Sequence, residues 1–137
     1  MSSENHIFYA PHSDDETLSM GASILQHLAQ AHRVFLVLLT DGAKDETRQC
    51  LNGEFPCKWH KRTHDPAEEN FHYVPLTEEA FLRARRQEFM DAAKLLGVPE
   101  SDIQVAMHHD SELPLDQMRE LVLSFETHRN IPGPKFH

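Results

Sequence analysis

Three ionisable side chains lie within four positions near the start of the chain: His12, Asp14 and Asp15, in the stretch FYAPHSDDETLSMG. Imidazole nitrogen and carboxylate oxygen are ligands that Zn²⁺ takes in catalytic sites. A histidine and an aspartate three positions apart can reach one ion around a tight turn. The neighbouring carboxylate can then face a water on that ion and take its proton. The stretch therefore predicts a hydrolytic metal site with one carboxylate as ligand and the other as base.

A purely structural interpretation fits the same residues. Asp14 and Asp15 precede a helical pattern and could be the N-cap and first residue of a helix, with His12 in the turn before it. A His-x-Asp-Asp string is also short enough to occur by chance. Spacing alone supports the two interpretations equally.

The elements around this corner indicate an α/β fold. Residues 6–10 are apolar and end at Pro11, which is typical of a buried strand. Residues 33–40 are almost continuously apolar, as in a strand buried on both faces of a parallel sheet. Between them, apolar residues at helical spacing predict one helix from about residue 14 to residue 31, with these side chains inward: Leu18, Ala22, Leu25 and Ala29. Strand, helix and strand predict a right-handed crossover unit whose ligand lies at the carboxyl ends of the strands.

The remaining chain continues the pattern after an interruption. Residues 41–76 are rich in glycine, proline and charge, and predict a long loop excursion over the site. A helix is predicted from residue 77 to residue 96, followed by a strand at 103–107 and a helix at 115–125. The inner face of the first of these helices is predicted to be Leu82, Phe89, Ala93 and Leu96. We therefore expect one α/β domain over residues 1–137, Rossmann-like and three-layered, with a mostly parallel sheet and helices on both faces.

Composition excludes some classes of partner. The net charge of -9 disfavours binding to nucleic acid, because such a surface repels phosphates. No apolar run is long enough for a membrane span, and the start MSSENH lacks the pattern of a signal peptide. We expect a cytoplasmic protein whose partner is a small molecule. The eleven histidines favour metal chemistry without locating it.

Three segments together resemble the LmbE/PIG-L-like family of zinc-dependent N-deacetylases: APHSDDETLSMG, LLTDGAKD and ARRQEFMDAAKLLGV. The resemblance covers roughly residues 6–110. It implies one Zn²⁺ per active site and hydrolysis of an N-acyl amide, such as an acetyl group, on an amino sugar or sugar conjugate of the N-acetylglucosamine type. It makes His12 and Asp15 metal ligands and Asp14 the general base. Ser13 stands where the family usually has proline.

Arg85 and Glu88 match an Arg-x-x-Glu pair of the family, whose arginine lies near the substrate. The helical pattern independently predicts that Arg85 faces inward with Glu88 as its partner, so a pair that fixes the helix on the sheet is slightly favoured over substrate contact. Asp41, after the second strand, could orient His12 or cap the next turn, and these are equally supported.

One part of the family pattern is missing. The resemblance implies a third zinc ligand from a later His-x-x-His segment, which this sequence lacks. The substitutes are His108, His109, His128 and His137, none at the family's spacing, so the third ligand stays unknown. A fragment of a longer deacetylase is the favoured explanation. The alternative function is that of an inactive relative, a binding module without turnover.

A second group of possible ligands lies in the predicted loop: Cys50, Cys57, His60 and His64. The Cys-x6-Cys spacing is wider than the two to four residues of structural zinc sites, so free thiols are favoured over a closed zinc site or a disulfide. Trp59, in the same loop, could stack on a sugar or pin the loop to the core, the commoner arrangement.

Overall fold

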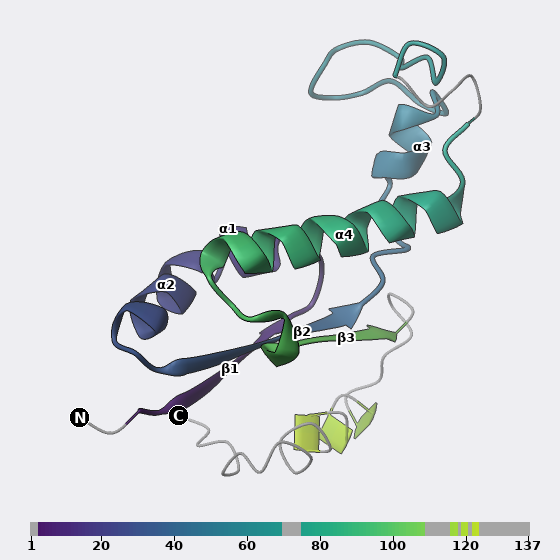
Figure 1. Cartoon of the computed structure of the whole chain (residues 1–137). Coiled ribbons are helices and arrows are strands. Elements are labelled where there is room, and N and C mark those ends of the chain that lie inside the picture. Colours follow the sequence, from purple (N-terminus) through teal and green to yellow (C-terminus); the bar gives the residue numbers. More distant parts are fainter. Residues whose placement is uncertain (1–2, 70–74, 109–115, 118, 121, 124–137) are drawn as a thin grey trace.

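The structure is a computed structural model that describes residues 3–69, 75–108, 116–117, 119–120 and 122–123. Its three described strands form a parallel sheet in the order β1-β2-β3 (Figure 1). They are β1 (Asn5–Ala10), β2 (Arg33–Thr40) and β3 (Ile103–His108). The central β2 pairs Phe35 with Ile7 and Leu36 with Ile103. The predicted α/β class with parallel strands is confirmed.

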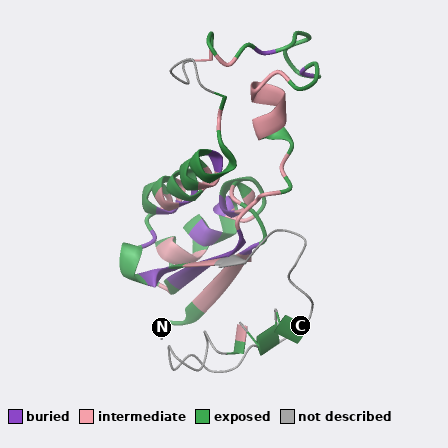
Figure 2. Cartoon of the chain, turned by 90° about the vertical axis from the view of Figure 1, so that its right-hand side faces the viewer, coloured by how far each residue is buried: buried purple, intermediate pink, exposed green. Residues whose placement is uncertain are grey.

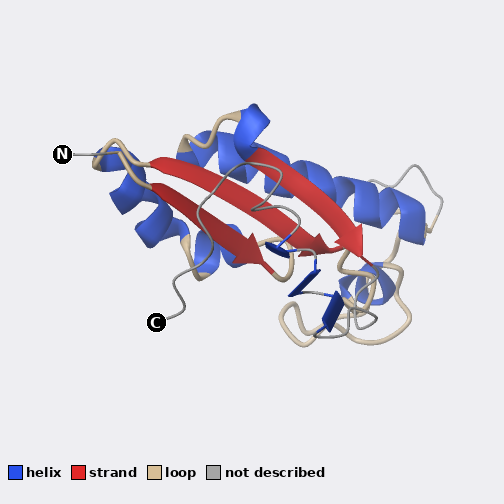
Figure 3. Cartoon of the chain, turned by 90° about the horizontal axis from the view of Figure 1, so that it is seen from below, coloured by secondary structure: helices blue, strands red, loops and turns tan. Residues whose placement is uncertain are grey.

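Three of the helices cover one face of this sheet. They are α1 (Asp15–Leu18), α2 (Gly21–Ala29) and α4 (Glu78–Leu96), which lie on the same side in two views (Figures 1 and 3). Residues 116–117, 119–120 and 122–123 are helical, as predicted, and lie on the opposite side of the sheet. The short η1 (Glu100–Asp102) leads into β3. The extent of the domain, residues 1–137, stays a prediction.

Strand β2 is buried on both faces, as its continuous apolar run predicts. Val34, Leu36 and Leu38 pack toward the helices in a cluster with Ile24 and Phe89. The alternating side chains on the other face form a second cluster, Phe35, Val37 and Leu39. Successive side chains of a strand point to opposite faces, so burial of both sets fixes the register of β2 against its neighbours. The position of the carboxyl end of β2 is thereby fixed as well.

The predicted single helix at residues 14–31 is wrong: α1 and α2 are separate. The backbone N–H groups of Ser19 and Met20 both donate to the carbonyl oxygen of Asp15, each at 3.1 Å, which ends α1 after one turn. The new helix then buries Ile24 and leaves Leu18 82% exposed and Leu25 50% exposed. The predicted inner face is therefore also wrong, and Leu18 points away from the core.

Helix α4 begins and ends where its sequence predicts. Thr77 Oγ1 accepts a hydrogen bond from the N–H of Ala80 at 3.2 Å, and Gly97 closes the helix with a positive φ of 96°. Phe81, Phe89 and Ala93 are buried along one stripe, with Phe81 in place of the predicted Leu82, which is half-buried. No helix among the described residues is long and apolar enough to cross a membrane.

The segment between β2 and α4 extends away from the sheet (Figure 1). It contains α3 (Thr47–Leu51), which its low periodicity did not predict. Two hydrogen bonds join Asn52, just after α3, to Leu76, just before α4: Asn52 Nδ2 donates to the Leu76 carbonyl at 2.9 Å, and the Leu76 N–H donates to Asn52 Oδ1 at 2.7 Å. Trp59 in this segment is 90% exposed, so it does not pin the loop to the core.

Candidate active site

An open pocket of about 440 Å³ lies where β1 and β2 end at the same edge of the sheet. Its lining comes from the turn after β1, from α1, from the turn after β2 and from one residue of α4: His12, Ser13, Asp14, Asp15, Leu18, Gly42, Lys44, Asp45 and Arg85. Ligands of open α/β sheets bind outside the carboxyl ends of the strands. Thr40 Oγ1 donates to the Pro11 carbonyl at 2.6 Å and so ties the two strand ends together behind the pocket.

His12 and Asp15 lie close enough to hold one ion. His12 Nδ1 is 3.7 Å from Asp15 Oδ2, and the His12 N–H donates to the same oxygen at 3.0 Å. This nitrogen and oxygen pair suits Zn²⁺ and faces an open pocket, so the donor set fits two positions of a catalytic zinc site. Within the described part of the chain, no group of three candidate ligands within 4.8 Å of one another includes His12. The side chain of His108 and the whole of His109, His128 and His137 lie outside the described residues.

Asp14 occupies the N-cap position of α1 without capping it. Its φ is 99°, in the left-handed region, and its carboxylate makes no hydrogen bond to the first turn of the helix. Instead Asp14 Oδ2 accepts a hydrogen bond from Arg85 Nη2 at 2.8 Å. The predicted positions of Asp14 as N-cap and Asp15 as first helical residue are therefore confirmed. The carboxylate of Asp14 does not cap the helix, however, and lines the pocket beside the pair formed by His12 and Asp15.

Arg85 faces inward, as predicted, and joins α4 to the turn after β1. Its side chain is 20% exposed and donates to Asp14 Oδ2, to the Ser13 carbonyl at 2.9 Å, and to Glu88. Burial alone would lower the pKa of Arg85, but the bonds to Asp14 and Glu88 raise it on balance. Arg85 thus has the predicted Glu88 partner and a second partner in Asp14, which the sequence did not identify.

Glu16 is a residue of this corner that the sequence analysis missed. It is 2% exposed, its Oε2 accepts from the Asp14 N–H at 2.8 Å, and burial raises the pKa of its carboxyl group. This hydrogen bond helps to hold the backbone of Asp14 in its left-handed conformation. The sequence does show a third acidic residue directly after Asp14 and Asp15. It was interpreted only as an acidic residue at a helix start, and therefore received no role in the site.

Asp41 caps the turn after β2. Its Oδ1 accepts from the N–H of Ala43 at 2.9 Å, which matches one of the two predicted roles. Its action on His12 stays a prediction. Lys44 and Asp45, a little further along, line the pocket and were not predicted.

The profile of one protein family matches residues 7–128, and its description is PIG-L, GlcNAc-PI de-N-acetylase. The chain belongs to the PIG-L family. No curated protein matched the chain in a sequence search. The resemblance read from the three sequence segments is thereby confirmed.

Two solved structures have a fold similar to that of this PIG-L family chain. The N,N'-diacetylchitobiose deacetylase from Pyrococcus horikoshii, complexed with its inhibitor MPG, superposes with a TM-score of 0.61 at 22% identity over 93% of this chain. GalB, the 4-carboxy-2-hydroxymuconate hydratase from Pseudomonas putida KT2440, gives a TM-score of 0.59 at 23% identity over 96%. The chain spans 39% and 44% of their lengths. One is named a deacetylase and the other a hydratase, so the shared fold does not decide the reaction.

A cluster of thiols and imidazoles lies in the segment beyond β2. Cys50 and Cys57 are both free thiols, as favoured from the sequence, and with His64 they bring their sulfur and nitrogen atoms within 4.8 Å of one another. The His60 N–H donates to Cys57 Sγ at 3.4 Å, and this bond, with one from His64, lowers the pKa of the Cys57 thiol to about 6. None of these residues lines the pocket.

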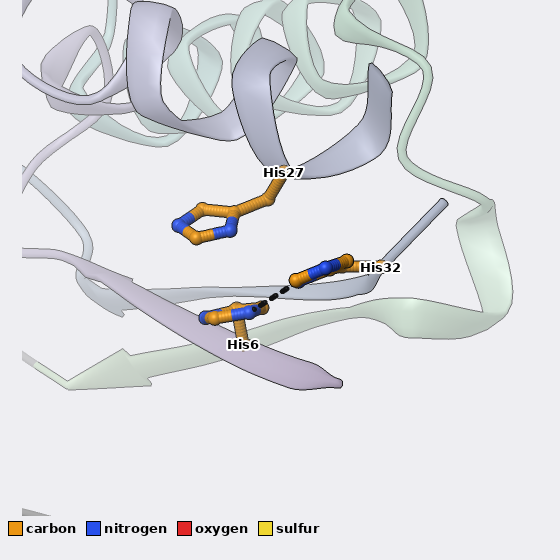
Figure 4. A group of neighbouring side chains, drawn as sticks. All are labelled: His6, His27 and His32. Atoms are coloured by element: carbon orange, nitrogen blue, oxygen red, sulfur yellow. Dashed lines mark hydrogen bonds between the residues drawn. The ribbon is translucent and has the colours of Figure 1, made fainter. Parts of the chain in front are cut away.

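Three histidines meet at the amino end of the sheet (Figure 4). His6 of β1 stacks on His27 of α2 with ring centroids 3.6 Å apart, and His6 Nε2 lies 2.8 Å from Nδ1 of His32. Burial and the two neighbouring imidazoles lower the pKa of His6. The sequence analysis did not single out this cluster, because its members come from a strand, a helix and the connection before β2 and share no local spacing.

Proposed function

We propose that this chain forms part of a zinc-dependent hydrolase that removes an acyl group, in the first place acetyl, from the nitrogen of an amino sugar or sugar conjugate. The observation that carries the proposal is that His12, Asp14 and Asp15 line one open pocket in a member of the PIG-L family. Its donors match the types that a catalytic zinc ion takes. A cytoplasmic location is part of the same proposal.

His12 and Asp15 would hold the metal ion. When bound, zinc supplies the charge that polarises the acyl carbonyl and activates water. Asp14 lies next to this pair and accepts the proton of the attacking water. Arg85 holds one oxygen of that carboxylate, Oδ2, through a hydrogen bond of 2.8 Å, and thereby fixes the direction in which the carboxylate faces the pocket. Glu16 fixes the backbone of the same residue.

The family profile and one of the similar folds both favour an acetylated amino sugar as the substrate. The family profile is described as a GlcNAc-PI de-N-acetylase, and one similar fold is a diacetylchitobiose deacetylase. Leu18, which is 82% exposed at the pocket, offers an apolar surface, and Lys44 and Asp45 offer polar groups nearby. This mixture of one apolar and several polar side chains suits a sugar, which has apolar ring faces and polar edges.

The test is release of acetate and free amine from N-acetylglucosamine and N,N'-diacetylchitobiose by the zinc-loaded chain. Asp14→Asn is expected to lower turnover by about 10²- to 10⁴-fold, the range for loss of a general base. Its zinc content is expected to stay unchanged. The matched control is Asp91→Asn on the exposed side of α4, which is expected to keep wild-type turnover.

Two outcomes would contradict this proposal. Equal loss of zinc and turnover in Asp14→Asn would mean that the roles of Asp14 and Asp15 are reversed. A chain whose His12→Ala variant binds as much zinc as the wild type, and which releases no acetate, would instead be a binding module without turnover.

A further inference from the structure

The segment from Asp41 to Glu69 has an unusual interior. Its buried residues are Cys57, 6% exposed, and His64, 4% exposed, whereas its large apolar side chains Phe55 and Trp59 are 36% and 90% exposed (Figure 2). A segment that buries a thiol and an imidazole in place of hydrocarbon gains little from the hydrophobic effect. Another interaction must therefore hold its chain together.

Three potential ligand atoms converge in this interior, and a fourth, from the exposed His60, lies beside them. The sulfur atoms of Cys50 and Cys57 and a nitrogen of His64 lie within 4.8 Å of one another. His60 Nδ1 lies 3.5 Å from Cys57 Sγ and 3.1 Å from His64 Nε2. In a tetrahedral zinc site, bond lengths of about 2.0 to 2.3 Å place neighbouring ligand atoms roughly 3.3 to 3.8 Å apart. The two separations of His60 Nδ1, 3.5 Å from Cys57 Sγ and 3.1 Å from His64 Nε2, are near these values. The three atoms of Cys50, Cys57 and His64 lie within 4.8 Å of one another, and His60 would complete the set by a small movement toward Cys50.

The surroundings of the four residues also match those of a metal centre. His64 Nδ1 bonds to the carboxylate of Glu69, so its Nε2 is the atom that faces His60 and the thiols. A carboxylate on the far nitrogen is the usual support of a metal-binding imidazole, because it fixes the ring and its tautomer. The turn that carries Cys57 is closed by a hydrogen bond from the Cys57 N–H to the Arg62 carbonyl at 2.8 Å.

The linear spacing is consistent with this arrangement once Cys50 is set aside. Cys57-x2-His60-x3-His64 has the short separations found between ligands of structural zinc sites. Cys50 is the ligand that lies farthest from the others in the sequence, and it belongs to α3. The wide Cys-x6-Cys spacing, which disfavoured a zinc site in the sequence, is bridged by folding of the loop.

We propose that Cys50, Cys57, His60 and His64 bind a structural zinc ion that joins α3 to the turn at residues 57–62. Four protein ligands leave no open position, so this centre is structural and separate from the pocket. None of its ligands lines that pocket, and the proposal does not depend on the hydrolase activity. A metal bound here stabilises the fold of the segment directly.

The test is titration of the reduced, chelator-treated full chain with Co²⁺, followed by absorption spectroscopy. We expect one equivalent of Co²⁺ with a thiolate-to-cobalt charge-transfer band, which Zn²⁺ abolishes by displacement. Co²⁺ is also expected to quench the fluorescence of Trp59, the single tryptophan, which lies between Cys57 and His60 in the sequence. Cys57→Ser and Cys50→Ser are each expected to weaken or shift the band, and His12→Ala is expected to keep it.

Glu69→Gln gives a milder test that keeps all four ligands. Loss of a carboxylate that orients a metal-bound histidine typically weakens metal affinity by about 10- to 100-fold. The matched control is Glu68→Gln, the exposed neighbour. If a cysteine variant does not fold, protection settles the question in the wild type: zinc is expected to block the reaction of both thiols with a disulfide reagent.

The proposal is overturned by any of three results. These are a cobalt spectrum without a thiolate band, thiols that react equally fast with and without zinc, and a band that His12→Ala removes while Cys57→Ser retains it. The last would assign the metal to the pocket. A zinc centre found here in a chain that releases no acetate would leave this proposal standing and the hydrolase proposal refuted.

Discussion

Ser13 and Arg85, which are 72 positions apart in the chain, hold each other by two hydrogen bonds that run in opposite directions. Ser13 Oγ donates to the Arg85 carbonyl at 2.7 Å, and Arg85 Nη2 donates to the Ser13 carbonyl at 2.9 Å. The same guanidinium reaches Asp14. Helix α4 is thereby fastened to the turn that carries the candidate catalytic residues. The family usually has proline where Ser13 stands, and a proline has no hydroxyl to give this bond.

Ser13→Ala removes one of the two hydrogen bonds. We expect the free energy of unfolding to fall by about 0.5 to 1.5 kcal/mol, the net value of one hydrogen bond, in urea denaturation. Ser23→Ala, on the exposed side of α2, is the control and should change the same quantity by no more than about 0.5 kcal/mol. Equal effects of both substitutions would mean that the hydroxyl of Ser13 does not join the two segments.

Arg85→Met removes the guanidinium but keeps most of the side-chain volume. We expect a loss of about 1 to 3 kcal/mol of unfolding free energy, the range for hydrogen bonds to charged groups, and toward its lower end because Asp14 and Glu88 are more than half exposed. Its neighbour Arg86 is exposed on the same helix and provides the control Arg86→Met. A wild-type denaturation curve for Arg85→Met would show that the guanidinium does not fasten α4.

Gly53→Ala tests how closely the backbone at Gly53 approaches the backbone at His64. Gly53 has a φ of 77°, and a Cβ there would lie 2.4 Å from the His64 carbonyl oxygen. Gly42 has nearly the same φ, 75°, with no atom within 4 Å of its added Cβ. Gly42→Ala should therefore cost only the backbone strain, about 1 to 2 kcal/mol. Gly53→Ala should lower the free energy of unfolding by clearly more than this and should weaken metal binding by the segment. Urea denaturation and metal titration of the same samples measure the two effects. Equal losses would argue against the close approach.

The imidazole cluster predicts a dependence of stability on pH. His6 has a lowered pKa in the folded protein because of burial and its neighbours His27 and His32, although Glu4 acts in the opposite direction. Below the ordinary value of 6.5 the unfolded state therefore binds more protons than the folded state. The contribution of His6 to stability should therefore fall as the pH is lowered through this value and return as the pH is raised.

The measurement is urea denaturation between about pH 7.5 and about pH 5.5, a window around the ordinary histidine pKa. His6→Phe keeps a flat ring in the stack and cannot take up a proton, so its stability should vary less with pH than that of the wild type. His12→Asn, outside the cluster, is the control and should keep the wild-type dependence. The prediction fails if His6→Phe and the wild type lose stability in parallel.

The sequence predicted those features that a short local pattern determines. Continuous apolar runs identified β1 and β2, and capping by Thr77 and Gly97 bounded α4. The parallel order and the corner with His12, Asp14 and Asp15 followed from these, because strand ends of a parallel sheet meet at one edge. Arg85 was placed correctly because it lies four positions before Phe89 on the predicted apolar stripe, although Phe81 rather than the predicted Leu82 is the buried residue of the preceding turn.

Features that depend on a single backbone break or on folding of a long loop were not predictable. Residues 18–29 contain two overlapping apolar stripes of the same period, and only the break after α1 decides that Ile24 is buried and Leu18 is not. Cys50 and Cys57 seemed too far apart in the sequence for one metal site. Their spacing along the chain does not show that the loop folds back and brings the two sulfur atoms within 4.8 Å. The meeting of His6 with His27 and His32 needs the register of β1 against β2, which no local pattern contains.

The paired hydrogen bonds between Asn52 and Leu76 matter for how this protein can change. They bring together the two ends of the stretch between these residues, so the ends of that stretch are held at one place whatever its length. The entropy of closing a loop grows slowly with its length, and insertions or deletions beyond the junction therefore cost the core little. This stretch can be enlarged, shortened or exchanged while the corner that carries His12, Asp14 and Asp15 keeps its geometry, so the chain can change there without a redesign of the candidate site.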